Sequence, residues 1–81
     1  MFTKEATRRL RGMPRNTEST IISKIDTLAA DPFAPNQNVT ALTAIDGFRL
    51  RVGDWRVLYS VNTEAKTLTI ATIVPRGEAY R

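Results

Sequence analysis

The chain has 81 residues, of which 42% are hydrophobic and 25% charged, which suits one compact domain over residues 1–81. It contains no cysteine and no histidine. A disulfide framework, a thiolate metal site and a cysteine nucleophile are therefore excluded, and the commonest general acid–base group is missing. Any catalysis is expected to rely on Lys, Arg, Tyr, Asp or Glu, with no metal and no other cofactor.

The formal net charge at pH 7 is +4, and the sequence pI is about 10.1. This surplus suits a polyanion such as nucleic acid, although a small domain can also carry such a charge simply to stay soluble. No apolar run approaches the roughly 18 residues of a membrane span, and the N-terminus lacks the apolar stretch of a signal peptide. A cytoplasmic protein without membrane contact is therefore expected.

Two helices are expected in the N-terminal part. Thr3 can cap a first helix that runs to Met13, where the following proline stops it. Asn16 or Thr17 can cap a second helix that ends at about Ala30. Its apolar residues recur at the spacing of one buried stripe: Ile21, Ile22, Ile25, Leu28 and Ala29. Together the two segments predict a helical hairpin.

The rest of the chain predicts a sheet. Residues 31–38 contain two prolines and form a loop, and three later segments are typical of strands: 48–52, 55–61 and 67–74. The expected fold class is α+β. An N-terminal helical hairpin is expected to pack on a small, mainly antiparallel, twisted sheet of three to four strands.

The pairing of these strands follows from the turn between the first two. Gly53 and Asp54 predict a two-residue hairpin turn, which places Arg51 opposite Arg56. A second hairpin would then form three pairs: Val61 with Leu68, Tyr59 with Ile70, and Trp55 with Val74. One face becomes apolar and is expected to carry the helices, which leaves the arginine face open.

That open face carries Arg49, Arg51 and Arg56. Like charges directly opposite one another cost about 0.2–1 kcal/mol per pair, so folding alone gives no reason for the cluster. Guanidinium groups suit phosphate, and we interpret the face as a phosphate-binding surface. The alternative is a soluble surface partly neutralised by carboxylates: Asp46, Asp54 or Glu78.

A second basic group surrounds the first helix: Arg8, Arg9, Arg11 and Arg15. A solvated helix face or contact with an RNA backbone would both explain it. Near the chain end, Tyr80 could stack on an exposed base or close the edge of the core, and Arg81 follows it. We count Arg8, Arg9, Arg11 and Arg81 as candidate RNA-binding residues.

In these features the sequence resembles the RelE/ParE superfamily of type II toxins. The pattern is a helical hairpin, a DP-containing loop, the block GFRLRVGDWRVLYSV and a closing strand followed by PRGEAYR. RelE-like members cleave mRNA in the ribosomal A site, whereas ParE-like members poison DNA gyrase without being nucleases. The RelE-like pattern implies five catalytic residues: Arg49, Arg51, Arg56, Arg76 and Tyr80.

The resemblance also implies a reaction and a partner. The RNA 2′-hydroxyl would attack the adjacent phosphate without a metal, Arg51 and Arg56 would hold the phosphorane, and Arg76 would assist the leaving oxygen. Because arginines stand where the best-known RelE-like proteins have lysines, the general base is left open. A cognate antitoxin is expected to bind the toxin in a hetero-oligomer.

The N-terminus departs from the family pattern. A strand usually precedes the segment FTKEA, whereas this chain starts at Met1, so that strand is expected to be short or missing. An exposed sheet edge tends to pair with another chain. An antitoxin segment or a second subunit is therefore expected to complete the edge.

Overall fold

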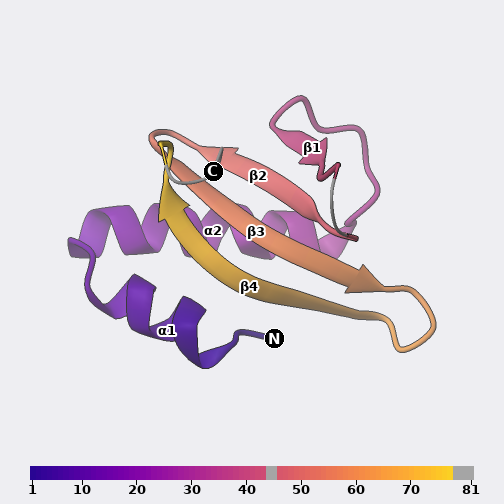
Figure 1. The fold of residues 1–81 in the computed structure, drawn as a ribbon, viewed down its shortest axis with the longest axis horizontal. Helices are drawn as coiled ribbons and strands as arrows, with labels where there is room; N and C mark the ends of the chain where they lie inside the picture. The colour runs from indigo at the N-terminus through magenta and orange to yellow at the C-terminus, as the bar shows by residue number, and fades with distance from the viewer. Residues whose placement is uncertain (44–45, 78–81) are drawn as a thin grey trace.

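The computed structural model describes residues 1–43 and 46–77. Six elements follow one another along the chain: α1 (Lys4–Arg11), α2 (Arg15–Ala30), β1 (Val39–Ala41), β2 (Phe48–Val52), β3 (Trp55–Asn62) and β4 (Thr67–Pro75). Each strand pairs antiparallel with the next, and α2 crosses one face of this sheet while α1 lies beside β4 (Figure 1). The expected α+β fold is confirmed. Within the described ranges, no helix has both the length and the apolarity to cross a bilayer.

The two helices begin in different ways. The side chain of Thr3 accepts a hydrogen bond from the backbone nitrogen of Ala6 at 3.1 Å, which confirms the predicted cap of α1. The predicted caps of α2 are wrong, because that helix already begins at Arg15 and Pro14 occupies the cap position. Proline suits a helix start because its ring fixes φ and its missing N–H has no helical partner to lose.

The buried stripe of α2 is narrower than expected. Ile21, Ile25 and Leu28 are buried, whereas Ile22 is 36% exposed and Ala29 is also exposed. Each helical residue advances by about 100°, so the two exposed positions lie well to one side of the buried ones. The buried three share one core with α1 and with the inner faces of β2, β3 and β4.

The hairpin of β2 and β3 has the predicted register. Val52 pairs with Trp55 across the turn, and Arg51 pairs with Arg56. Gly53 has a φ of 58°, in the left-handed region that this turn requires and that glycine adopts without a steric penalty.

The pairing of β3 with β4 is only partly as predicted. Val61 pairs with Leu68 and Tyr59 with Ile70, but the register shifts between Leu58 and Tyr59. One extra residue of β4 enters the ladder there, as in a β-bulge, so Trp55 pairs with Pro75 and not with Val74. Val74 therefore lies opposite Arg56 on the arginine face.

The residues before α1 cover the outer edge of β4. Phe2 forms a single parallel bridge with Ile70, and Met1 accepts a backbone hydrogen bond from Ile70 at 2.8 Å. The hydroxyl of Thr3 donates to the carbonyl of Ala71 at 2.6 Å, at the position of the bulge. The same threonine that caps α1 thus anchors the helix to the irregular part of β4.

Tyr59 places a phenol in the core. Its side chain is 3% exposed, its ring stacks on Phe48 at a centroid distance of 5.5 Å, and its hydroxyl has no hydrogen-bond partner. Burial raises the pKa of Tyr59 above its ordinary value of about 10, because the ionised phenolate is poorly solvated there.

The neighbouring isoleucines of α2 test how this helix faces the core. We expect Ile21→Ala to lower the free energy of unfolding by about 2–5 kcal/mol, because it leaves a cavity under the sheet. Ile22→Ala, the matched control, should cost less than about 1 kcal/mol because its side chain is partly in water. Urea denaturation followed by circular dichroism measures both, and equal losses would contradict this orientation.

The buried phenol predicts a loss of stability in alkali. Above about pH 10 the unfolded chain releases the Tyr59 proton while the folded protein retains it, so the free energy of unfolding falls as the pH rises, whereas this contribution is complete below pH 10. Tyr59→Phe should be as stable as the natural chain at neutral pH, or slightly more so, and should show a shallower alkaline decline. Urea denaturation midpoints of both proteins, measured from neutral pH to above about pH 10, test this prediction. Identical declines in both proteins would show that Tyr59 does not cause the loss of stability.

Candidate functional site

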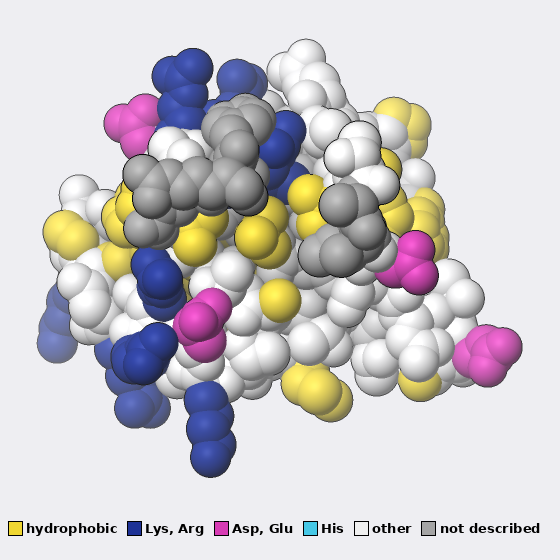
Figure 2. All heavy atoms as spheres, in the orientation of Figure 1, with side chains coloured by type: hydrophobic (Ala, Val, Ile, Leu, Met, Phe, Trp, Pro, Cys, Tyr) yellow, Lys and Arg dark blue, Asp and Glu magenta, His cyan; other side chains and the backbone are white. Residues whose placement is uncertain are grey.

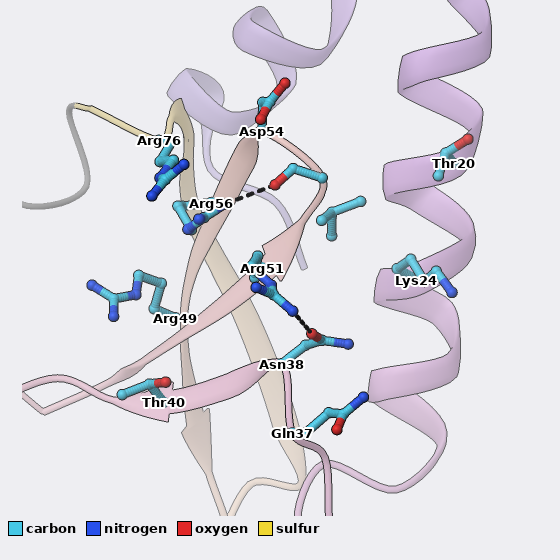
Figure 3. A pocket seen from close by; sticks show the side chains of 12 residues that line it. Thr20, Lys24, Gln37, Asn38, Thr40, Arg49, Arg51, Asp54, Arg56 and Arg76 are labelled. Carbon is cyan, nitrogen blue, oxygen red and sulfur yellow. Dashed lines mark hydrogen bonds between the residues drawn. The ribbon is translucent and has the colours of Figure 1, made fainter.

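A groove of about 780 Å³ lies at the edge of the sheet where β2 turns into β3. We call it the arginine groove. Figure 3 shows Arg49, Arg56 and Arg76 on one side, Lys24 and Thr20 of α2 on the other, and Arg51 with Asn38 between them. The complete lining is Thr20, Lys24, Gln37, Asn38, Thr40, Arg49, Arg51, Val52, Gly53, Asp54, Arg56 and Arg76.

Three separate segments bring the arginines together. Arg49 and Arg51 alternate along β2, so both lie on the same face, and Arg56 joins them from β3. Arg76 follows β4, and its backbone nitrogen donates to the carbonyl of Asp54 at 2.9 Å. This bond ties the end of β4 to the β2–β3 turn and so brings Arg76 beside the other three arginines.

Arg56 is held by the backbone. It is only 5% exposed, and its Nη1 donates to the carbonyl of Gly53 at 3.0 Å and to that of Trp55 at 2.9 Å. Charged donors on neutral carbonyls make strong hydrogen bonds, particularly where water is partly excluded. Arg56 therefore secures the β2–β3 turn in addition to lining the groove.

Arg51 is exposed and turns toward the loop before β1. Its Nη2 donates to Oδ1 of Asn38 at 2.9 Å, and its backbone nitrogen donates to the Asn38 carbonyl at 2.8 Å (Figure 3). Arg51 and Arg56 are direct neighbours in register, yet each guanidinium has its own neutral acceptors. This arrangement explains how the sheet accommodates the like-charged pair.

The groove is strongly basic. Five cationic side chains and one carboxylate line it: Lys24, Arg49, Arg51, Arg56, Arg76 and Asp54. An ion pair joins Arg8 to Glu5 on α1, at 4.0 Å, and neither residue lines the groove. Of the carboxylates expected to neutralise the cluster, Asp46 lies outside the groove, and Glu78 is outside the described residues.

Sequence reasoning missed the wall that α2 and the following loop provide. The helices were expected to leave the arginine face open, but Thr20 and Lys24 of α2 border the groove. β1 pairs only with residues 48–50 of β2, so beyond Val39 the groove continues around the edge of β2 toward the helix. The Thr20–Lys24 spacing of one helical turn was the only signal in the sequence, and it is weak.

The basic residues of α1 form a separate surface. Arg8 and Arg11 line a small hollow with Phe2, and neither lines the arginine groove. Figure 2 shows basic side chains gathered over α1 at the lower left and, separately, at the upper left, where the β2–β3 turn lies in Figure 1. Arg9 and Arg15 do not line the arginine groove either.

Two expected site residues lie beyond the part that the structure describes, namely Tyr80 and Arg81. Their roles stay predictions. Among residues 1–43 and 46–77, no group of Asp and Glu side chains is arranged to hold a metal ion.

Comparison with solved structures defines the class of protein. The chain is similar to the isolated E. coli RelE toxin (16% identity, 98% of this chain and 86% of the other, TM-score 0.77). It is also similar to chains of the RelBE2 toxin–antitoxin complex from Mycobacterium tuberculosis (24%, 94% of both chains, TM-score 0.80) and of the archaeal RelE–RelB complex from Pyrococcus horikoshii (28%, 94% and 91%, TM-score 0.76). The fold is therefore that of the RelE toxins.

The family follows from the sequence. Residues 1–80 match the model of the ParE toxin of the type II toxin–antitoxin system parDE. The chain belongs to this family and is a type II toxin of the RelE/ParE superfamily. No curated protein sequence matches it.

The two paired arginines, Arg51 and Arg56, are expected to differ in their effect on stability. Arg56→Ala should lower the free energy of unfolding by about 1.5–3 kcal/mol, because it removes a charged donor from two backbone carbonyls in a partly buried turn. Arg51→Ala should cost about 0.5 kcal/mol or less, since its side-chain bond is exposed. Thermal and urea unfolding of the two variants measure the difference. A larger loss for Arg51→Ala would contradict the stabilising role assigned to the Arg56 hydrogen bonds.

Proposed function

We propose that this toxin cleaves mRNA in the A site of the ribosome, by attack of the RNA 2′-hydroxyl on the adjacent phosphate and without a metal. The observation that carries the proposal is the convergence of Arg49, Arg51, Arg56 and Arg76 on one groove. Guanidinium groups bind phosphate through paired hydrogen bonds, and several of them can stabilise the extra negative charge of a phosphorane.

The reaction breaks one bond and forms another at the same phosphorus. The 2′-oxygen bonds to phosphorus and loses its proton, while the bond to the 5′-oxygen breaks and that oxygen gains a proton. The products are a 2′,3′-cyclic phosphate and a 5′-hydroxyl end. Asp54 is the one carboxylate among the described groove residues, so most of the acceleration is assigned to charge stabilisation and to alignment of the RNA by the ribosome.

The arginines divide the work according to their contacts. Arg51 and Arg76 are exposed and are assigned to the transferring phosphate and the leaving oxygen. Arg56 donates to two backbone carbonyls of the β2–β3 turn, so it is assigned to attracting the phosphate by its charge and to positioning the turn. Tyr80 is assigned to stacking on the nucleotide, and Arg8, Arg9, Arg11 and Arg81 to contacts with the RNA backbone.

A cognate antitoxin is the proposed protein partner, in a cytoplasmic hetero-oligomer. The similar solved structures from Mycobacterium tuberculosis and Pyrococcus horikoshii are named as RelBE2 and RelE–RelB complexes. The basic groove favours an acidic, amphipathic helix or extended segment that covers or distorts it. The outer edge of β1 also offers a strand that an extended segment can complete, since β1 is the terminal strand of the order β1-β2-β3-β4.

Inhibition of DNA gyrase without nuclease activity is the second candidate. Two observations favour it, namely the match to the ParE toxin family and the engagement of Arg56 by backbone carbonyls. A gyrase inhibitor needs a binding surface and no general base.

The nuclease activity is tested by translation with purified ribosomes and mapping of mRNA ends by primer extension. We expect cuts in the A site that appear only when ribosomes are present. Arg51→Ala and Arg76→Ala should each lower the cleavage rate by about 100-fold or more, the loss typical of removing one donor to a developing oxyanion.

Lys66→Asn is the matched control. It removes one positive charge in the β3–β4 turn, outside the groove, at a φ of 56° that asparagine tolerates. This control should cleave at the natural rate. Intact mRNA at micromolar toxin would overturn the nuclease proposal, and loss of gyrase supercoiling in a parallel assay would then support the second candidate.

A further inference from the structure

The arginine groove has a second wall that the proposed reaction leaves without a role. It consists of Thr20 and Lys24 on α2 and of Gln37 and Asn38 in the loop before β1. At about 780 Å³ the groove lies in the upper part of the roughly 300–1,000 Å³ range of ligand sites, which is more room than one phosphate needs. We call these four residues, Thr20, Lys24, Gln37 and Asn38, the α2-side wall.

Lys24 supplies the positive charge of this wall. Its side chain is exposed, and it forms no ion pair with any residue in the described ranges. Figure 3 shows it across the groove from Arg49 and Arg76, with Arg51 in between. A lysine ammonium is a point charge on a flexible stem, so it can follow a phosphate along the groove without a fixed geometry.

Asn38 supplies directed hydrogen-bond donors. Its backbone nitrogen donates to Oδ1 of Asn36 at 2.9 Å, and its carbonyl and its own Oδ1 both accept from Arg51. With Oδ1 oriented toward Arg51, the NH₂ group of the amide is available as a donor. The α2-side wall therefore presents a positive charge and a hydrogen-bond donor, and both can bind a phosphate oxygen.

Thr20 contributes differently. Its hydroxyl donates to the carbonyl of Asn16 at 2.9 Å, so the proton is directed back along α2 and away from a ligand. The polar recognition on this wall is thus concentrated in Lys24 and Asn38.

We propose that Lys24 and Asn38 form a second phosphate subsite, which binds the phosphate next to the one cleaved. The inference rests on the proposed ribonuclease function and gives its substrate a minimum length of two consecutive phosphates in the groove. Lys24 neutralises the neighbouring phosphate, and the Asn38 amide donates to one of its oxygens. The cleaved phosphate stays with Arg51 and Arg76.

The test measures binding of purified toxin to a fluorescein-labelled, fully 2′-O-methylated single-stranded RNA, which cannot be cleaved by 2′-oxygen attack. Fluorescence anisotropy gives Kd at several salt concentrations. For single strands the logarithm of the association constant falls with the logarithm of salt by about 0.7 per phosphate neutralised. A slope therefore counts phosphate contacts, and a purely structural role would not change it.

We expect Lys24→Gln to weaken binding several-fold and to reduce the salt slope by about 0.7. Lys24→Arg should restore both, and Lys66→Asn should change neither. An unchanged slope in Lys24→Gln would overturn the subsite. Because Lys24 is exposed on a helix, these variants are expected to fold normally, which circular dichroism verifies.

Asn38→Ala separates a direct contact from an effect through Arg51. If the amide itself binds the phosphate, affinity falls several-fold and the salt slope stays the same, because a neutral group releases no counterion. A slope reduced by about 0.7 would show that Asn38 acts only by positioning Arg51, and would overturn its place in the subsite.

Arg51→Ala distinguishes failure of the subsite from failure of the proposed function. If Arg51→Ala weakens RNA binding while Lys24→Gln does not, the subsite is refuted and the groove remains an RNA site. If neither variant changes binding, the subsite is refuted, and the cleavage assay with ribosomes decides the proposed function separately.

Discussion

The antiparallel pairing of β2 with β3 is the constraint on which the rest of the structure depends. Because side chains alternate along both strands, this one register sends the apolar residues to the helices and Arg49, Arg51 and Arg56 to the opposite face. A shift by one residue would exchange the two faces and bury the arginines. The hydrogen bonds from Arg56 to the carbonyls of Gly53 and Trp55 hold the turn that sets this register. One arginine therefore stabilises the hairpin on which the other two lie.

The bulge in β4 is the second decisive feature. It places Ile73 opposite Val57 in the core and Val74 opposite Arg56 on the arginine face, and it allows Pro75 to pair with Trp55 at the start of β3. Arg76 then follows directly beside the β2–β3 turn, where its backbone bonds to Asp54. The groove thus combines a regular hairpin, which aligns two strands, with an irregular strand that delivers the last arginine.

The fold supports more than one molecular outcome, so the function has to be argued from the groove. The family match and the solved relatives establish a type II toxin. Four arginines around one groove favour phosphate chemistry, and the lysine and amide on the α2-side wall favour a substrate that continues past the reacting group.

The sequence by itself determined the α+β class, the helical hairpin and the register of β2 with β3, because these depend on local spacing and turn chemistry. It also identified the arginines that line the groove. Only the tertiary structure decided the bulge opposite Tyr59, the exposure of Ile22, the burial of Arg56 and the contribution of Lys24 and Asn38. These features arise where segments distant in sequence meet, so no local pattern encodes them, and packing of the whole chain selects them.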